Sequence, residues 1–394
     1  MGILPFGPTY TAMTPPFSLL IKPASADCNL ECDYCFYLRK KDLYPETARH
    51  RMPDHVLDRL IQSYMATSQP AYSMIWQGGE PTLMGHDFFQ QAIELQKRYG
   101  RTGARIANSV QTNATLITPK LASLFASYRF LLGCSLDGPA GMHDTYRKAP
   151  GGRPSHHLAE KGIRVLQEHR VPVNALVLVS QANVHKPLEV YEYLKRQGLT
   201  FIQFVPCVEF DDQGRLQPFS VSGPEWGRFM LSIFEAWMAH DRTRVSVRLF
   251  ETILSKLVYG QAVDCCFASK CDHYFVVEYN GDIYPCDFFV FPEYKIGNIM
   301  DMSWSEAQDS PIARQFASLK QEWNPDCDVC GHKDLCMGDC LKFRHNMRNG
   351  SREKSWLCPG WKFFFSETRE RFEMLARSIR DTQPYPGSYP KGRV

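Results

Sequence analysis

Apolar and polar positions along the first half of the chain form short blocks that predict a regular succession of strands and helices. Apolar or alternating runs predict six strands, at residues 18–22, 73–77, 104–111, 130–136, 171–179 and 201–205. Between them, apolar residues at helical spacing predict helices at residues 53–67, 87–99, 119–127, 157–169 and 187–197. Strands that alternate with helices indicate right-handed parallel βα units. This pattern fits either a doubly wound sheet or a barrel.

Length and composition are those of a globular protein with more than one domain. The 394 residues suggest two or three domains, and 44% hydrophobic with 22% charged residues is an ordinary composition. A formal net charge of +3, with Lys and Arg scattered along the chain, argues against a nucleic-acid partner. No apolar run predicts a membrane span, and residues 1–16 lack the features of a signal peptide.

The cysteines change this picture. Fourteen cysteines without a leader sequence indicate thiols kept reduced in the cytoplasm, and metal ligation explains them most simply. Cys28, Cys32 and Cys35 follow the first predicted strand with the spacing C-x3-C-x2-C. Three thiolates on one loop can bind three irons of a 4Fe–4S cluster and leave the fourth iron open to a small molecule. Zinc is the alternative, although zinc sites usually pair C-x2-C units or add histidines.

Polar residues also follow the second and fourth predicted strands. Residues 76–83 read Trp-Gln-Gly-Gly-Glu-Pro-Thr-Leu, where paired glycines allow close backbone approach and Glu80 offers an acceptor for an ammonium group. Ser135 and Asp137 alternate at a strand end, so both side chains point to one face, which suits ribose hydroxyls. Arg147 suits a carboxylate. Taken alone, each stretch also fits an ordinary turn.

Together these stretches resemble the motifs of the radical S-adenosylmethionine (SAM) enzymes. The cluster signature of that family is C-x3-C-x-(aromatic)-C, and residues 78–81 resemble its GGEP motif. The resemblance implies an α/β fold, a partial (β/α)6 TIM-type barrel, with the site at the C-terminal ends of the strands. It also implies that SAM binds the open iron and yields a 5′-deoxyadenosyl radical. The SAM contacts that it implies are Tyr34, Gly79, Glu80, Ser135, Arg147 and Val208.

A second group of nine cysteines occupies the C-terminal third of the chain. Cys271 and Cys286 flank a predicted hairpin with its turn at residues 280–281, and a C-x2-C-x5-C-x3-C run covers residues 327–340. Zinc ribbons use similar C-x2-C knuckles. Eight well-placed cysteines, however, also complete two four-thiolate shells.

This group resembles the SPASM extension of peptide-modifying radical SAM enzymes, a cysteine-rich domain that holds two auxiliary 4Fe–4S clusters. By its spacing to the next ligand in that family, Cys265 is preferred over Cys266. The resemblance implies a first auxiliary cluster on Cys265, Cys271, Cys286 and Cys340. It implies a second auxiliary cluster on Cys327, Cys330, Cys336 and Cys358.

Asp287 directly follows Cys286 and stands between aromatic residues, where a partly desolvated carboxylate is suited to take a proton. The match extends well beyond the metal motifs. Residues 18–25, 77–82, 109–113, 284–288 and 297–299 resemble anaerobic sulfatase-maturating enzymes. This resemblance implies oxidation of a Cys or Ser side chain in a sulfatase to Cα-formylglycine (3-oxoalanine), with Asp287 as the catalytic proton acceptor and an auxiliary cluster as the electron acceptor.

The implied partners are an unfolded or nascent sulfatase polypeptide, carrying a Cys/Ser-x-Pro/Ala-x-Arg motif, and a flavodoxin- or ferredoxin-type electron donor. We expect a cytoplasmic monomer with no nucleic-acid or membrane partner. A SPASM enzyme that crosslinks or otherwise modifies another ribosomal peptide is the nearest alternative, and a zinc-binding adaptor protein is a remote one.

The predicted domain organisation has four parts. These are an arm at residues 1–16, the barrel at 17–245, the SPASM domain with a C-terminal helix at 246–375, and a mobile tail at 376–394. Arg248 stands in a strand-like stretch at residues 245–250, as a solvated residue or as a contact for an acidic or carbonyl-rich part of a substrate.

Overall fold

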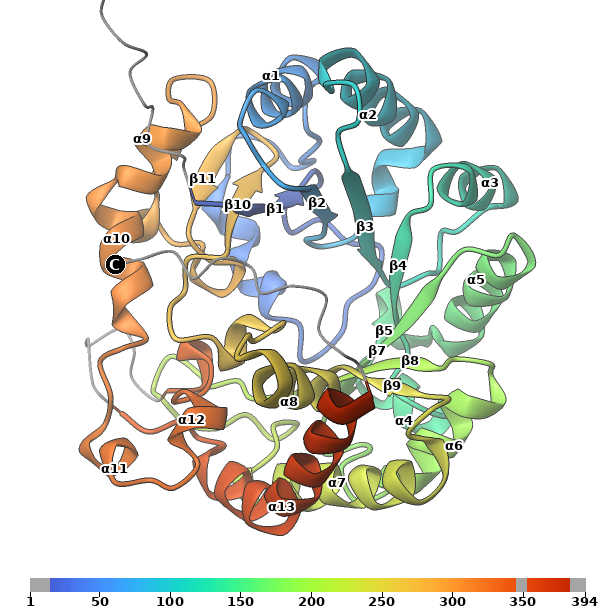
Figure 1. The fold of residues 1–394 in the computed structure, drawn as a ribbon. Coiled ribbons are helices and arrows are strands. Elements are labelled where there is room, and N and C mark those ends of the chain that lie inside the picture. Colours follow the sequence, from blue (N-terminus) through green and yellow to red (C-terminus); the bar gives the residue numbers. More distant parts are fainter. Residues whose placement is uncertain (1–14, 345–352, 383–394) are drawn as a thin grey trace, which may run out of the picture.

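The computed structural model describes residues 15–344 and 353–382. Its centre is a curved sheet of six parallel strands, each close to its predicted position (Figure 1). These strands are β1 (Ser18–Lys22), β2 (Tyr72–Trp76), β3 (Ile106–Thr112), β4 (Leu131–Ser135), β7 (Val173–Val179) and β8 (Phe201–Pro206). The predicted succession of parallel βα units is therefore confirmed.

Amphipathic helices cover the convex face of this sheet. They are α1 (Asp54–Met65), α2 (Gly85–Tyr99), α3 (Pro119–Ser127), α5 (His156–Glu168), α6 (Pro187–Arg196) and α7 (Gly223–Ala236). In α1 the buried residues fall at helical spacing on one side, at Val56, Leu57, Leu60, Ile61 and Tyr64. This stripe explains why the sequence pattern located the helices.

The strands alternate between buried and half-buried residues. In β7, every second residue from Val173 to Val179 is buried, and the residues between them are only partly covered. Leu178, one of the half-buried residues, packs beside Cys28 and Tyr34 on the concave face. In a closed barrel the inner face would be filled by side chains. Here the barrel is partial, so its concave face has room for a cofactor and a substrate.

The C-terminal third continues the same sheet. Strands β10 (Tyr274–Glu278) and β11 (Asp282–Tyr284) form the predicted hairpin, with Gly281 in the left-handed region at φ 91°. Strand β10 pairs in parallel with β1, and β11 pairs with the short strand β12 (Gly297–Asn298). The C-terminal hairpin thus extends one edge of the barrel sheet.

Short elements complete the fold. Near the barrel they are α4 (Ala140–Tyr146), the hairpin of β5 (Lys148–Ala149) with β6 (Arg153–Pro154), and β9 (Ser246–Val247). In the C-terminal third they are α8 (Arg248–Tyr259), α9 (Trp304–Asp309), α10 (Pro311–Leu319), α11 (Pro325–Asp328), α12 (Lys333–Cys336) and α13 (Cys358–Thr382).

One sequence expectation here is wrong. The alternating stretch at 245–250 is a strand only at Ser246–Val247, and Arg248 begins α8. The predicted C-terminal helix of the SPASM domain is α13, which packs against α7 and α8. The domain limits stay predictions, and residues 1–14 of the predicted arm and 383–394 of the predicted tail lie outside the described residues.

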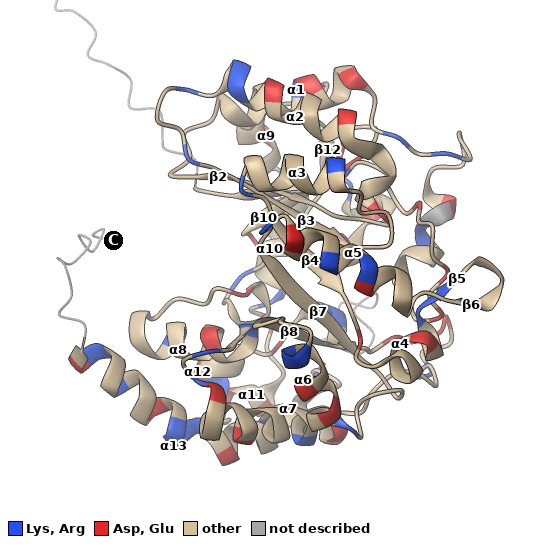
Figure 2. Ribbon diagram, turned by 90° about the vertical axis from the view of Figure 1, so that its right-hand side faces the viewer, with Lys and Arg blue, Asp and Glu red and all other residues tan. Residues whose placement is uncertain are grey.

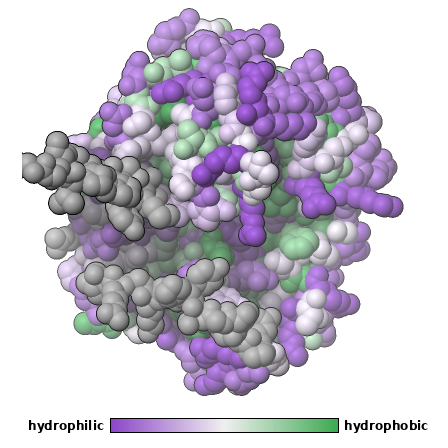
Figure 3. Space-filling view, turned by 45° about the horizontal axis from the view of Figure 1, so that its top comes forward, coloured by the Kyte–Doolittle hydropathy of each residue, from purple (hydrophilic) through white to green (hydrophobic). Residues whose placement is uncertain are grey.

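Figures 2 and 3 show how charge and hydropathy are distributed over the described residues. Basic and acidic side chains are interspersed over the outer helices (Figure 2). The face in Figure 3 is mostly hydrophilic, and hydrophobic side chains show in a recess near its centre. Within the described ranges, no helix combines the length and apolar character needed to cross a membrane.

Candidate active site

The predicted cluster loop leaves the C-terminal end of β1. Cys28, Cys32 and Cys35 lie on this loop and pack with Leu30 and Tyr34 in a small apolar cluster. The amide nitrogen of Cys35 donates to the carbonyl of Cys32 at 3.0 Å, which turns the loop between these two ligands. Burial raises the pKa of Cys28 to about 12 and that of Cys32 to about 11.

These buried thiols fit an iron–sulfur cluster. At neutral pH burial keeps them protonated, so a group that binds thiolates here must bring positive charge of its own. Iron does so, because a thiol that coordinates a metal cation is deprotonated. Asn113 also points its amide at Cys28 Sγ, 3.6 Å away, as a polar contact to a ligand sulfur.

The GGEP loop docks against the cluster loop by direct backbone contact. The amide nitrogen of Gly79 donates to the Ser25 carbonyl at 2.8 Å, and that of Glu80 donates to the Asp27 carbonyl at 2.8 Å. A Cβ on Gly79 would lie 2.0 Å from the Asp27 oxygen, so only glycine allows this approach. Gly78 adopts φ 121°, which also favours glycine. The two predicted SAM-binding loops are therefore one rigid unit.

The Glu80 carboxylate is fully buried and occupied by protein donors. It accepts hydrogen bonds from Thr82 N and Thr112 Oγ1 at 2.9 and 2.8 Å, and from Asn113 N at 2.7 Å. Burial raises the pKa of this carboxyl. Glu80 thereby ties the GGEP loop to the end of β3. Its predicted contact with the SAM amino group stays a prediction.

Two of the predicted SAM contacts, Tyr34 and Arg147, meet at one buried carboxylate, that of Asp137. Asp137 accepts from the Tyr34 hydroxyl and from Arg147 Nε at 3.1 Å. Burial opposes the charge of Asp137, but the Arg147 guanidinium outweighs it and lowers the pKa of the carboxyl. Ser135 accepts from Gln111 at 3.3 Å, and Val208 is buried in the main hydrophobic core. Asp137 therefore fixes Tyr34 and Arg147, and its suitability for ribose hydroxyls stays a prediction.

Asp287 lies buried at the end of the β10–β11 hairpin, 3% exposed. Its Oδ2 accepts from the Tyr37 hydroxyl and from Gln77 Nε2, the latter at 3.2 Å. Its Oδ1 has no hydrogen-bond partner among the described residues. Lys22 Nζ lies 3.7 Å from that oxygen. A buried carboxylate with one free oxygen is suited to accept a proton from a bound group.

Two buried lysines flank Asp287. Lys22 and Glu278 are cross-strand neighbours in the β1–β10 pair, and their charges meet at 2.5 Å. Burial opposes the charge of Lys22, yet Glu278 and Asp287 together raise its pKa. Lys40 donates to the backbone carbonyl of Asp287, and burial lowers the pKa of Lys40 to about 8.

Sequence reasoning did not single out Tyr37, Gln77, Lys22 and Lys40. Gln77 was visible as the residue before the glycine pair, and Tyr37 as the second residue after Cys35. Lys22 was visible as a charged residue ending an apolar strand. None of these signals connects them to Asp287, because the connection depends on the pairing of β1 with β10.

The cysteines of the first predicted auxiliary cluster lie close to one another near the β10–β11 hairpin. The thiols of Cys271, Cys286 and Cys340 lie close enough to perturb one another electrostatically, and Cys265 perturbs Cys271 and Cys286. Burial raises the pKa of Cys271 to about 12. Cys265 and Cys266 are close to each other, since their sulfurs and an Asp264 oxygen lie within 4.8 Å of one another. The preference for Cys265 stays a prediction.

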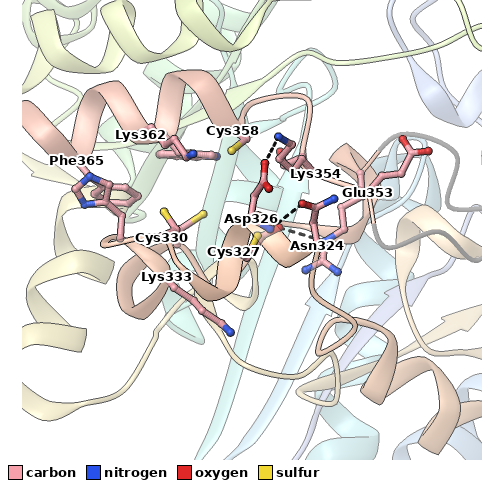
Figure 4. A pocket seen from close by; sticks show the side chains of 16 residues that line it. Asn324, Asp326, Cys327, Cys330, Lys333, Glu353, Lys354, Cys358, Lys362 and Phe365 are labelled. Carbon is pink, nitrogen blue, oxygen red and sulfur yellow. Dashed lines mark hydrogen bonds and ion pairs between the residues drawn. The ribbon is translucent and has the colours of Figure 1, made fainter.

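The cysteines of the second predicted auxiliary cluster line one pocket. Cys327 and Cys330 come from the α11 segment, Cys336 ends α12, and Cys358 begins α13. Figure 4 shows Cys327, Cys330 and Cys358 pointing into this pocket, with Lys354 paired to Asp326 at its rim. A pocket lined by four thiols is compatible with a closed four-thiolate cluster.

Arg248 lies apart from these groups. Its guanidinium donates to the Val263 carbonyl at 2.6 Å and lies 4.0 Å from the Asp264 carboxylate. Its side chain is half-exposed. Of its two predicted roles, the structure supports that of a surface residue which caps a neighbouring loop.

Comparisons with known proteins agree with this geometry. Family profiles match at residues 23–194 for the Radical SAM superfamily and at residues 265–331 for SPASM, an iron-sulfur cluster-binding domain. The chain is 35% identical to the serine-type anaerobic sulfatase-maturating enzyme of Bacteroides thetaiotaomicron, over 95% of each chain. It is 32% identical to the cysteine-type enzyme of Clostridium perfringens, over 93% of this chain and 100% of the other.

A solved structure is similar to this chain in fold as well as in sequence. Native anSMEcpe with bound AdoMet and Cp18Cys peptide has a TM-score of 0.86 and 32% identity, over 93% of this chain and 100% of that chain. The zinc-adaptor alternative therefore falls away, and the partial barrel with a SPASM domain is confirmed. The chain belongs to the family of anaerobic sulfatase-maturating enzymes within the radical SAM superfamily.

Proposed function

We propose that this enzyme oxidises a Cys or Ser side chain of a sulfatase polypeptide to Cα-formylglycine. The observation that carries the proposal is Asp287, a buried carboxylate whose Oδ1 lacks a hydrogen-bond partner among the described residues and which adjoins the proposed cluster ligand Cys286. Hydrogen abstraction alone leaves a carbon radical. Loss of a proton and of one electron is needed to complete the carbonyl.

We infer three 4Fe–4S clusters and one SAM as the cofactors. When bound, the cluster on Cys28, Cys32 and Cys35 and its SAM supply a 5′-deoxyadenosyl radical. The chain's own part is to position them. Tyr34, Gly79, Glu80, Ser135, Arg147 and Val208 are proposed to form the SAM site. In support of this, Gly79 and Glu80 dock against the cluster loop, and Asp137 links Tyr34 of that loop to Arg147.

Asp287 is proposed to take the proton of the target thiol or hydroxyl. Tyr37 and Gln77 hold its Oδ2, so that Oδ1 is the oxygen presented to the substrate. The hydrogen atom leaves the target Cβ, the proton passes to Asp287, and one electron passes toward the auxiliary clusters. A Ser target then gives the aldehyde directly, whereas a Cys target gives a thioaldehyde that water hydrolyses.

The proposed macromolecular partners follow from this chemistry. One is an unfolded or nascent sulfatase carrying a Cys/Ser-x-Pro/Ala-x-Arg motif, since the target must reach a buried carboxylate as an extended segment. The other is a flavodoxin- or ferredoxin-type electron donor for the first cluster. We propose that the enzyme acts as a monomer in the cytoplasm.

An anaerobic peptide assay tests the proposal. Reconstituted enzyme, reductant and SAM should convert sulfatase peptides with Cys or Ser at the target position to the aldehyde, with a loss of mass that mass spectrometry resolves. Alanine at the target position is the matched control. Formation of 5′-deoxyadenosine with both peptides left unchanged would count against sulfatase maturation and favour another peptide substrate.

A further inference from the structure

Two buried cations separate the two sets of auxiliary cysteines. Lys320, at the end of α10, is 0% exposed, and Arg344 is 4% exposed. No carboxylate of the described residues lies within 4 Å of either charged group. Their hydrogen bonds run to backbone carbonyls. A buried cation without an anionic partner is costly unless a negative group is supplied nearby.

Lys320 faces the first cysteine set. Its Nζ donates to the carbonyls of Cys265 at 2.7 Å and Cys266 at 2.6 Å, which places the ammonium directly behind the proposed ligand Cys265 and its neighbour Cys266. Its charge also acts electrostatically on the sulfurs of Cys271 and Cys340. The cation is therefore oriented toward the space where four thiolates converge.

Arg344 lies between the two sets. It donates to the carbonyls of Lys320 at 3.0 Å and Gly338 at 3.2 Å. It interacts electrostatically with Cys271 of the first set and with Cys327 of the second. Arg344 also lines the pocket that holds the second set. Lys320 and Arg344 thus form a connected pair that spans the gap between both cysteine shells.

These cations bear on the reduction of the proposed auxiliary clusters. Each one-electron reduction adds a negative charge to a centre that four thiolates already make anionic, and net charge is one determinant of cluster potential. Asp339 acts electrostatically on both cations, but it forms no ion pair within 4 Å with either of them. It is also occupied by Ser355 and Trp361 as donors.

We propose that Lys320 and Arg344 raise the reduction potentials of the auxiliary clusters, Lys320 mainly that of the first, and thereby make the first cluster an acceptor for the substrate's electron. This inference rests on the proposed clusters. The electron is the one that remains after the hydrogen atom has left the target Cβ and the proton has passed to Asp287. The acceptor cluster gains that single electron.

A redox titration of the holoenzyme, monitored by electron paramagnetic resonance, tests the role of Lys320. Lys320→Met keeps the side-chain length but removes the charge. It should lower the equilibrium constant for reducing one auxiliary cluster at least ~10-fold, equivalent to about 59 mV. Lys320→Arg should retain most of the wild-type potential. Lys195→Met is the matched control, since Lys195 pairs with Glu192 and Asp241 on the barrel helices.

Arg344→Gln provides a second, independent reading, and it should lower the potentials of both auxiliary clusters. Unchanged potentials in Lys320→Met and Arg344→Gln with full iron content would overturn the proposal. Loss of iron from both variants would also overturn it, because the cations would then serve only to hold the cysteine loops. None of these measurements uses the sulfatase peptide, so they are independent of the substrate assignment.

Discussion

Asp287 is fixed so that one oxygen alone is available. Tyr37 and Gln77 occupy Oδ2, and Lys40 anchors the backbone of the same residue. Oδ1, which has no hydrogen-bond partner in the described part of the chain, is where a target hydroxyl or thiol would transfer its proton. At the residue scale, the site therefore depends on preorganised hydrogen bonds more than on the mere presence of an acidic group.

We expect Asp287→Asn to separate radical formation from oxidation. The amide fills the same space but cannot take the proton, so aldehyde formation should fall at least ~100-fold while SAM cleavage continues. Aldehyde per 5′-deoxyadenosine, measured by mass spectrometry, reports the effect. The exposed Asp301→Asn is the matched control. A wild-type ratio in Asp287→Asn would rule out the assigned base.

His143 predicts a pH dependence of stability. Its Nδ1 accepts from the Asp137 amide at 3.3 Å, and burial lowers its pKa to about 3. The unfolded chain binds this proton near pH 6.5, so stability is lost as pH falls from 6.5 toward 3. Between about pH 7.5 and about pH 5.5 this loss is about 1.4 kcal/mol.

Urea unfolding at these two pH values measures the His143 contribution. His143→Gln cannot take up the proton, so its free energy of unfolding should change less with pH than that of the wild type. The difference in pH dependence between the two proteins separates the contribution of His143 from that of other histidines. One of these is His50, whose pKa is raised by Asp27 despite burial. Identical pH profiles for the two proteins would exclude a neutral His143.

At the scale of elements, the cluster loop and the GGEP loop form one unit because backbone hydrogen bonds join them directly. The sequence pattern located the six strands and five helices to within two residues at either end, since each has a clear period. The pattern missed α4, which has only seven residues, and it misassigned the start of α8. At 245–250 apolar residues alternate, but the helix begins where side chains pack against α13.

Gly79→Ala tests the docking of the loops. The new Cβ would meet the Asp27 carbonyl at 2.0 Å, and backbone cannot yield cheaply. We expect SAM to bind at least ~10-fold more weakly because the loop is displaced, which corresponds to a loss of about 1.4 kcal/mol in binding free energy. Titration calorimetry measures the affinity. Gly141→Ala, in α4 with no atom within 4 Å of the added group, should leave it unchanged.

If Gly79→Ala bound SAM as tightly as the wild type, the two loops would have to move independently. Retained iron content in the variant separates a local change in the SAM site from loss of the cluster.

At the scale of the molecule, the active site is made by the sheet edge that joins the barrel to the C-terminal third. Lys22 and Glu278 meet across β1 and β10, and Lys342 pairs with Glu209 across the concave side. Motifs in the sequence identified the cysteines and the GGEP loop because these signals are local. The environment of Asp287 was not predictable in this way, since it combines residues from both ends of the chain.

Lys22→Met tests this junction. Removal of one partner leaves Glu278 buried without its cation, so the free energy of unfolding should fall by about 3–5 kcal/mol. The double variant Lys22→Met with Glu278→Met should recover at least half of the loss, because an apolar pair has no charge to desolvate. Chemical denaturation followed by tryptophan fluorescence measures both. A double variant as unstable as the single one would contradict this account.

The pairing of β1 with β10 has a consequence for biosynthesis. Lys22 and Glu278 are 256 residues apart, so one edge of the first strand waits for its neighbour until most of the chain has left the ribosome. During that interval an apolar strand edge is open to wrong partners, and such late contacts slow folding. The cluster loop follows this same strand. Assembly of the radical-generating centre is therefore tied to completion of the segment that carries the proposed base.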